Sequence, residues 1–428
     1  MLAHRLAPWL ARRGIHYGWV MIAITFMTAL STAAAMGMPG VLIAPLRQEF
    51  GWDTTDISGP LALRLLLYGL MGPFAAALIY RYGVVRVVAV AVSIIVTGMA
   101  LASQMTELWQ LWATWGVMLG FATGMTALVL GATVASRWFT ARRGLVLGLL
   151  TAANATGQLL FLPLAAWLAE HLGWRYALMP AALSCLLALL LMVLFAVDHP
   201  ATLGLAPYGE TKVTPPPRPT QGAVRTSFST LREASRSRVF WALFITFFIC
   251  GGSTNGLVQT HFIPLCMDMG MLQVQAAGVL ALMGAFDFAG TIFSGWLSDR
   301  FDNRWLLFWY YGLRGLSLLY LPYSGFTLVG LTTFAVFYGL DWVATVPPTV
   351  RLAAQGFGRE RAAVVFGWVF TAHQLGAATA AFGGGLARDT LGSYLPAFLA
   401  AGLACAVAAV VILIIPRPQP RPVLVAAE

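Results

Sequence analysis

Five ionisable side chains lie inside long apolar runs of the sequence, where no neighbouring residue could solvate them: Arg64, Asp287, Arg314, Asp341 and His373. Leaving a charge alone at the centre of a membrane helix costs on the order of 2.5–3.5 kcal/mol, so such groups face a partner or a water-filled cavity. A carboxylate or an imidazole can take up and release a proton there, and an arginine fork can hold a carboxylate through two N–H groups. These residue types predict proton transfer and anion binding.

The composition places these side chains in a membrane. Hydrophobic residues make up 59% of the 428 residues and charged residues only 10%, whereas soluble domains hold about 45–50% and about 25%. Twelve apolar runs are long enough for a helix to cross about 30 Å of hydrocarbon. They lie near 17–45, 57–80, 84–103, 107–135, 144–168, 175–197, 239–265, 274–297, 305–322, 325–347, 362–386 and 391–415. The first run is too long for the apolar core of a signal peptide, so we expect it to be retained, and Pro39 and Pro45 predict a broken outer end.

The basic residues predict the orientation. Most of the 26 Lys and Arg residues fall at one side of the twelve runs, and only Arg47, Arg175 and Arg388 fall in loops on the other side. The positive-inside rule therefore predicts a multi-pass protein of the cell inner (plasma) membrane with both termini in the cytoplasm. The net charge of +10 follows from this orientation, so we expect no nucleic-acid partner.

The chain divides into two similar halves. LAEHLGWRYALMPAALSC (168–185) and LARDTLGSYLPAFLAAGLAC (386–405) occupy the same place in each half, and a polar, proline-rich stretch separates the halves. We expect a six-helix bundle over 1–197, a cytoplasmic linker over 198–238 and a second bundle over 239–428. Duplicated bundles are typical of transporters that rock around a site at the membrane midplane. The predicted fold is all-α, with twelve transmembrane helices in two pseudo-symmetric bundles.

Polar residues recur on one face of several predicted helices. At spacings of three and four they form narrow stripes, which face protein or water rather than lipid. Singly, such residues are more often contacts between helices, but together they predict a substrate-binding cavity. They are Thr151, Asn154 and Gln158 in the fifth run, Asn255 and Gln259 in the seventh, and Thr291 in the eighth. The four cysteines have neither metal-ligand spacing nor a disulfide pattern, so we expect no metal site.

Two loops carry a recognisable motif. Gly295, Asp299, Arg300 and Arg304 match the Gly-x-x-x-Asp-Arg-x-Gly-x-Arg signature of the major facilitator superfamily, with Asp302 where a glycine is usual. The first half keeps Arg81, Gly83 and Arg86 but has Tyr80 in place of the aspartate and Ala76 in place of the glycine. The chain thus resembles this superfamily, which implies the twelve-helix fold and an inner-gate role for these residues.

Two further stretches resemble one branch of that superfamily. HYGWVMIAITF opens the first helix, and SRWFTARRGLVLGLLTAANATGQ (136–158) enters the fifth; both are similar to monocarboxylate and oxalate/formate porters. Porters of that branch typically carry an arginine one turn after the aspartate of helix eight and a lysine late in helix one. Thr291 and Gly40 stand at those positions here, so Arg64 or Arg314 would have to bind the anion, or the solute differs.

These observations predict a secondary transporter that works by alternating access and couples protons to the uptake of a small organic anion. We expect Arg64 and the polar stripes to bind the solute, although Arg64 could instead form a salt bridge or extend to the outer surface. Asp287, Asp341 or His373 would carry the proton, Arg314 would pair with Asp287 or bind the anion, and Asp341 could instead support a helix break near Pro347 and Pro348. We expect no cofactor, and we expect the protein to be a monomer.

Two other functions compete with this prediction. The aromatic and methionine content favours an exporter of amphipathic toxic compounds. An intramembrane enzyme that modifies lipids is the remote alternative, because the sequence shows neither a nucleophile–base pair nor a metal-ligand cluster. We therefore expect a protein that is not an enzyme.

Overall fold

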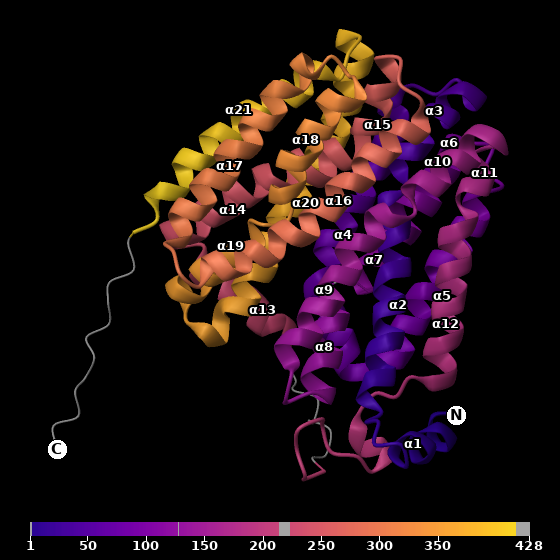
Figure 1. Cartoon of the computed structure of the whole chain (residues 1–428), viewed down its shortest axis with the longest axis vertical. Coiled ribbons are helices and arrows are strands. Elements are labelled where there is room, and N and C mark those ends of the chain that lie inside the picture. Colours follow the sequence, from indigo (N-terminus) through magenta and orange to yellow (C-terminus); the bar gives the residue numbers. More distant parts are fainter. Residues whose placement is uncertain (1, 127, 214–222, 417–428) are drawn as a thin grey trace.

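The described residues fold almost wholly into helices (Figure 1). The structure is a computed structural model and describes residues 2–126, 128–213 and 223–416. Each of the twelve predicted runs coincides with helical structure. Eight helical stretches are long and apolar enough to cross a membrane by length and composition. The other four predicted runs coincide with α4, α9 with α10, α17 and α20.

The helices of the first half follow the predicted runs closely. In chain order they are α2 (Gly18–Gly37) with α3 (Pro39–Phe50); α4 (Thr54–Tyr82); α5 (Val84–Ala102); α6 (Leu108–Leu111), the π-helix η1 (Trp112–Leu119), α7 (Gly120–Thr126) and α8 (Leu128–Trp138); α9 (Arg143–Leu160) with α10 (Leu162–His171); and α11 (Trp174–Ala177) with α12 (Met179–Phe195).

The second half repeats this plan. Its helices are α14 (Arg238–Gly251), the π-helix η3 (Gly252–Val258) and α15 (Gln259–Asp268); α16 (Gln273–Ser298); α17 (Asn303–Tyr320); α18 (Leu328–Asp341) with α19 (Val346–Phe357); α20 (Arg359–Leu391); and α21 (Leu395–Val411). The run predicted at 325–347 is too short, because α19 continues the tenth segment to Phe357 beyond a break.

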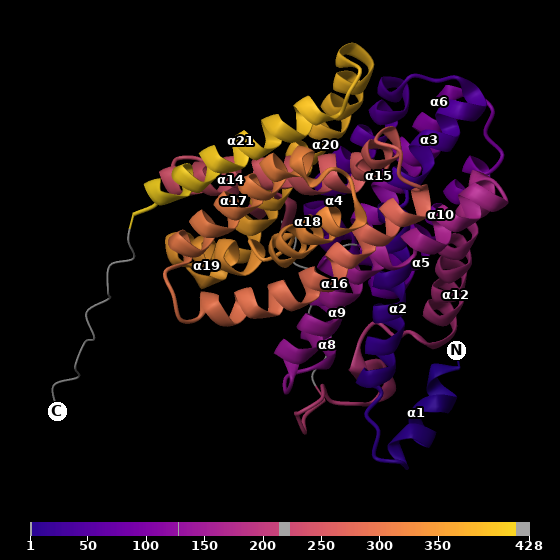
Figure 2. The same cartoon turned by 45° about the horizontal axis from the view of Figure 1, so that its top comes forward.

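The two halves form two bundles that meet at one end. In Figures 1 and 2 the first half, coloured indigo to magenta, lies beside the second half, coloured orange to yellow. Helix α4 packs along α20, α3 packs against α15, and α10 packs against α16. At the opposite end, where α8 and α19 lie, the bundles diverge (Figure 1).

Hydrogen bonds join the bundles at the end predicted to face outward. The carboxylate of Asp389, at the end of α20, accepts the N–H groups of Thr54 and Thr55 at 3.3 and 2.6 Å and the Thr55 hydroxyl at 2.7 Å. The Gln273 amide donates to the Val41 carbonyl at 2.6 Å. These bonds close the molecule at this end, whereas the bundles diverge at the end predicted to be cytoplasmic (Figure 1).

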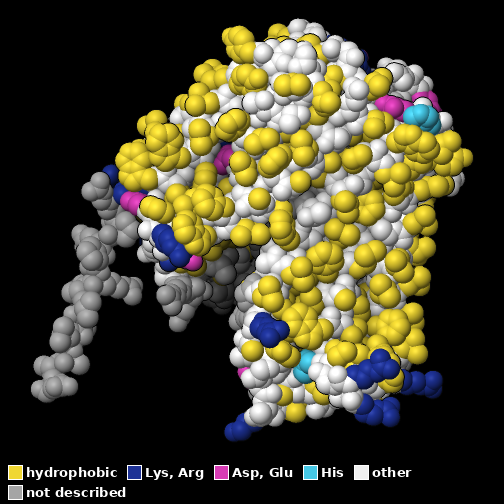
Figure 3. All heavy atoms as spheres, in the orientation of Figure 1, with side chains coloured by type: hydrophobic (Ala, Val, Ile, Leu, Met, Phe, Trp, Pro, Cys, Tyr) yellow, Lys and Arg dark blue, Asp and Glu magenta, His cyan; other side chains and the backbone are white. Residues whose placement is uncertain are grey.

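The surface fits a membrane environment. In Figure 3 hydrophobic side chains are spread over the whole visible face, while the basic side chains gather at the lower end near α1 (Ala3–Ala11) and at the left edge of the second half. The predicted linker, of which 198–213 and 223–238 are described, contains a helix, α13 (Ala223–Ala234), which lies against α20 and α4. The indole of Trp368 in α20 donates to the Ser227 carbonyl at 3.1 Å.

Glycines let the helices around the central space approach closely. A Cβ added at Gly251 would lie 1.7 Å from the carbonyl oxygen of His373, and one at Gly290 would lie 2.0 Å from that of Leu340. Small residues allow such backbone contacts between membrane helices. The first contact sets the end of α14, directly before η3, beside the middle of α20, and the second sets α16 against the end of α18. Both contacts position polar side chains that are described below.

We predict that Gly251→Ala destabilises the protein, because the new methyl group meets a backbone carbonyl that cannot rotate away. The expected cost is about 1–3 kcal/mol, as for other overpacked sites. Thermal unfolding of the purified protein in detergent measures it. Gly278→Ala in α16 is the matched control, because its Cβ would meet nothing within 4 Å. Equal melting temperatures for both variants would contradict the close approach of α14 and α20.

Candidate functional site

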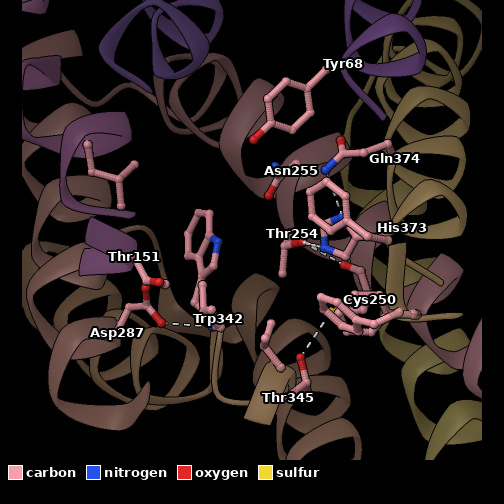
Figure 4. A pocket seen from close by; sticks show the side chains of 16 residues that line it. Tyr68, Thr151, Cys250, Thr254, Asn255, Asp287, Trp342, Thr345, His373 and Gln374 are labelled. Carbon is pink, nitrogen blue, oxygen red and sulfur yellow. Dashed lines mark hydrogen bonds between the residues drawn. The ribbon is translucent and has the colours of Figure 1, made fainter. Parts of the chain in front are cut away.

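A cavity of about 120 Å³ lies between the two bundles (Figure 4). The cavity is large enough to hold several waters or a small solute. Its polar lining residues are Tyr68, Thr151, Thr254, Asn255, Asp287, Thr345, His373 and Gln374. Its apolar lining residues are Leu159, Phe247, Cys250, Trp342, Val343, Val346, Phe366 and Phe370.

Asp287 of α16 is the one acidic residue among the described residues of this lining. Its side chain is mostly buried, and its Oδ1 accepts the Val343 N–H at 2.8 Å and the Thr291 hydroxyl at 3.0 Å. Oδ2 has no hydrogen-bond partner among the described residues. In Figure 4 Asp287 lies on the same side of the cavity as Thr151. One carboxylate oxygen is thus fixed by two protein groups, and the other is bonded by none of the described residues.

His373 of α20 lies on the opposite wall (Figure 4). Its Nε2 lies 3.4 Å from the Thr254 hydroxyl, its Nδ1 lies 3.2 Å from the Gln374 amide nitrogen, and its ring stacks on Phe370. The Thr254 hydroxyl donates to the Cys250 carbonyl at 2.7 Å, so its oxygen can accept a hydrogen bond from an Nε2–H group. These contacts suit the neutral ring with its proton on Nε2. The wall therefore offers uncharged hydrogen-bonding groups.

Arg314 and Asp341 do not line the cavity but form a buried ion pair behind it. The Arg314 Nε lies 2.6 Å from Asp341 Oδ2, and Nη1 lies 2.8 Å from the sulfur of Cys250. Nη2 donates to the main-chain carbonyls of Asp341 and Trp342 at 2.6 and 3.1 Å. The ion pair considered between Asp287 and Arg314 is thus formed by Arg314 and Asp341 instead, and Asp341 stands at the expected helix break.

Arg64 of α4 is also buried away from the cavity lining. Its Nη1 donates to the carbonyls of Ala35 and Met36 at 3.3 and 3.0 Å, and the guanidinium lies over the Trp115 ring. Because Pro39 has no N–H, the Ala35 carbonyl lacks its usual partner in the helix. Arg64 forms none of the described salt bridges and does not extend to the surface. Instead, it donates hydrogen bonds to the carbonyls at the end of α2.

The predicted polar stripes divide between the cavity and other contacts. Thr151 and Asn255 line the cavity, whereas Gln259 is buried nearer the closed end and Thr291 binds Asp287. The side chains of Asn154 and Gln158 lie outside the described residues. The π-helix η3 carries Asn255, in line with the frequent placement of such turns at functional sites.

The second-half motif forms contacts at the predicted cytoplasmic end. Asp299 pairs with Arg351 of α19, whose Nη1 also donates to the Ser298 carbonyl at 2.8 Å. Arg304 lies 2.6 Å from Asp302 and donates to the Ile415 carbonyl at 2.9 Å. The guanidinium of Arg300 lies over the Trp296 ring, and a Cβ at Gly295 would meet nothing within 4 Å. Asp299 thus joins the end of α16 to α19, and Arg304 joins the start of α17 to the residues after α21.

The first-half motif obtains an acid from elsewhere in the chain. Arg81 and Arg86 are exposed, and Gly83 has a φ of +90°, where a Cβ would lie 2.6 Å from the Asp198 carboxylate. Asp198, just after α12, accepts the Val85 N–H at the start of α5 at 2.9 Å. Burial and the nearby Arg137 lower the pKa of the adjacent His199. The sequence signal for Asp198 was its place at the end of an apolar run.

Gly40 departs from the resembling porters for a steric reason. Its Cβ would lie 2.9 Å from the Gln259 carbonyl oxygen, where α3 meets α15. A lysine at this position could not fit without moving the two helices apart. The first-helix cation of the resembling branch is therefore incompatible with this close approach.

The sequence prediction missed the aromatic part of the lining. Tyr68, Phe247, Trp342, Phe366 and Phe370 form much of the wall, with Thr254 and Gln374 beside the predicted Asn255 and His373. Aromatic residues are frequent throughout this chain, so only their adjacency to polar residues could have marked them.

Comparison with known proteins identifies the family. The model of the Major Facilitator Superfamily matches residues 24–381. The chain belongs to the Major Facilitator Superfamily. It is a multi-pass membrane transporter with the fold of that superfamily, and not an enzyme.

Its similar proteins include transporters at low identity. An uncharacterised MFS-type transporter, YcxA of Bacillus subtilis, is 24% identical over 88% of this chain and 90% of that protein. Monocarboxylate transporter 12-B of Danio rerio is 24% identical over 91% of this chain and 84% of that protein, and monocarboxylate transporter 13 of Bos taurus is 26% identical over 90% and 86%. A D-xylose–proton symporter structure has a TM-score of 0.71 at 14% identity, covering 94% of this chain and 98% of that one.

We predict that Arg64→Gln lowers the thermal stability of the protein, because two buried carbonyls lose a charged donor. The expected loss is about 1–3 kcal/mol, seen as a lower melting temperature in detergent. Arg86→Gln, at an exposed arginine of α5, is the control and should leave the melting temperature unchanged. An Arg64→Gln protein as stable as the wild type but unable to bind organic acids would show instead that Arg64 is a ligand.

Proposed function

We propose that this transporter couples the movement of protons to the uptake of a small organic anion. The observation that carries the proposal is the Asp287 carboxylate, which faces the cavity with one oxygen held by Val343 and Thr291 and the other without a described partner. A carboxylate in this position can bind a proton when the cavity opens to one side and release it when the cavity opens to the other. The similarity to monocarboxylate transporters supports an organic acid as the solute.

The solute would be held without a cation in the lining. The described lining residues include no arginine or lysine, so the carboxylate of the solute would accept hydrogen bonds from neutral groups such as the amides of Asn255 and Gln374. Two carboxylates close together do not ionise at once, so an anion would enter only after Asp287 has been protonated. Asp287 is the proton carrier in this proposal, with His373 as a second candidate on the opposite wall. Arg64 and Asp341, in contrast, are assigned to positioning the helices.

The closed end of the molecule supports alternating access. The bonds of Asp389 to Thr54 and Thr55 join α20 to α4 and would have to break when the cavity opens outward. The contacts at the ends of α16 and α19 would form the opposite gate. The predicted direction of transport rests on both termini being cytoplasmic.

The exporter of amphipathic compounds is the second candidate. Aromatic rings and a single carboxylate can also bind an organic cation through ring faces and charge pairing. The two functions differ in their dependence on pH, because an amine requires an ionised Asp287 and an acid requires a protonated one.

We expect Asp287→Asn to abolish accumulation of an organic acid driven by a pH gradient in proteoliposomes, while exchange of labelled for unlabelled acid continues in part. Asparagine keeps the hydrogen-bond acceptor for Val343 but cannot carry a proton. The acid is chosen by thermal-shift screening of acetate, lactate, pyruvate and benzoate at mildly acidic and neutral pH. Glu210→Gln, at an exposed carboxylate, is the control and should accumulate the acid normally.

The same screen with benzylamine and choline separates the two functions. Stabilisation by the acids, stronger at acidic pH, supports acid uptake; stabilisation by the amines, stronger at neutral pH, supports the exporter. Accumulation that survives unchanged in Asp287→Asn would exclude Asp287 as the proton carrier.

A further inference from the structure

The tenth membrane segment is broken where it lines the cavity. Helix α18 ends at Asp341, α19 begins at Val346, and residues 342–345 form the gap. Trp342, Val343 and Thr345 of this gap face the solute space. Pro347 and Pro348 open α19 and lack the N–H groups that a continuous helix would direct at residues 343 and 344. The break therefore exposes backbone groups at the depth of the cavity, where each needs a partner.

Side chains from two neighbouring helices supply those partners. Arg314 of α17 donates to the carbonyls of Asp341 and Trp342, and Ser294 of α16 donates to the carbonyl of Ala344 at 2.5 Å. On the other face of the gap, Asp287 accepts the Val343 N–H. The proton-binding candidate is thus bonded to the same gap that Arg314 holds open.

The charges around the gap nearly cancel. Arg314 is fully buried and paired with Asp341, and the second oxygen of Asp341 has no described hydrogen-bond partner. The charged and titratable groups that act on Asp287 or share its cavity, among the described residues, are Arg314 from α17, Asp341 from α18, His373 from α20, Tyr68 from α4 and the Cys250 thiol from α14. With the ion pair intact, Asp287 is the only net charge of this set when His373 is neutral.

We propose that Arg314 and Asp341 are a positioning pair for proton coupling: they hold the gap at 342–345 so that the Val343 N–H meets Asp287, and they balance each other's charge beside it. Neither residue touches the solute. The pair therefore sets the pH at which Asp287 takes up its proton, and it links that protonation to the shape of the tenth segment. This inference rests on the proposed role of Asp287, but it concerns residues outside the cavity.

The test is an infrared titration of the Asp287 carboxyl group in reconstituted protein, with Asp287→Asn used to assign the band. We expect Asp341→Asn to leave the Arg314 charge unbalanced and to move the midpoint about one unit toward lower pH. Arg314→Gln leaves Asp341 unbalanced and should move the midpoint about one unit toward higher pH. The double variant should return close to the wild type.

Ser294→Ala is the matched control. It removes one hydrogen bond of the same gap without changing a charge, so it should lower the melting temperature and leave the midpoint in place. Arg314→Lys keeps the charge but not the planar fork; it should change the carbonyl stretching frequency of protonated Asp287 as the Val343 N–H moves, with a smaller shift of the midpoint. If Arg314→Gln is not recovered folded, Arg314→Lys and Asp341→Asn carry the test.

Unchanged midpoints in folded Asp341→Asn and Arg314→Gln, or shifts in the same direction, would overturn the proposal. An unchanged midpoint in Asp341→Asn together with an unchanged frequency in Arg314→Lys would do so as well. The titration needs no solute, so it separates this inference from the proposed function. Midpoint shifts of opposite sign in the two variants, without transport of any organic acid, would support the positioning role of the pair. They would exclude the proposed uptake of an organic acid.

Discussion

The structure depends on one constraint, that backbone groups exposed by a broken helix must find partners inside a bilayer. Water cannot supply them there, and an unpaired carbonyl or N–H costs several kcal/mol. This chain meets the constraint twice with a buried arginine. Arg64 serves the carbonyls before Pro39, and Arg314 serves those before Pro347. The second break forms part of the cavity wall.

The same constraint explains why the buried charges divide into two groups. A guanidinium has five donors and suits several carbonyls at once, so the two arginines are occupied by the scaffold. Asp287 and His373, with fewer donors, remain at the cavity. Close glycine contacts bring η3 to α20 and α16 to α18, which places these two residues on facing walls. The cavity is thus lined by Asp287 and His373 rather than by the two arginines, because backbone carbonyls already bind the arginines.

The sequence predicted the fold well because membrane helices leave a strong local signal. Apolar length located the twelve segments, and the motif near Asp299 identified the superfamily, which the family comparison confirmed. The predicted end of the tenth segment was wrong. Pro347 and Pro348 interrupt the helix, and it continues as α19 because side chains of neighbouring helices bond the backbone groups at the break. Helix α13 in the linker was missed, since its stability comes from packing on α20 rather than from its own apolar length.

The site was harder to predict, because depth along a helix does not give its rotation. Counting residues from the inner loops places Asp287, Arg314, Asp341 and His373 at similar depth, yet only two of them face the cavity. Which face each residue takes is decided by partners distant in sequence: Asp341 is 27 residues from Arg314, and Val343 is 56 residues from Asp287. A carboxylate bonded to a helix break and a carboxylate paired with an arginine look alike in sequence. Their chemistry differs because the first keeps an oxygen available to the cavity, and only the folded chain distinguishes them.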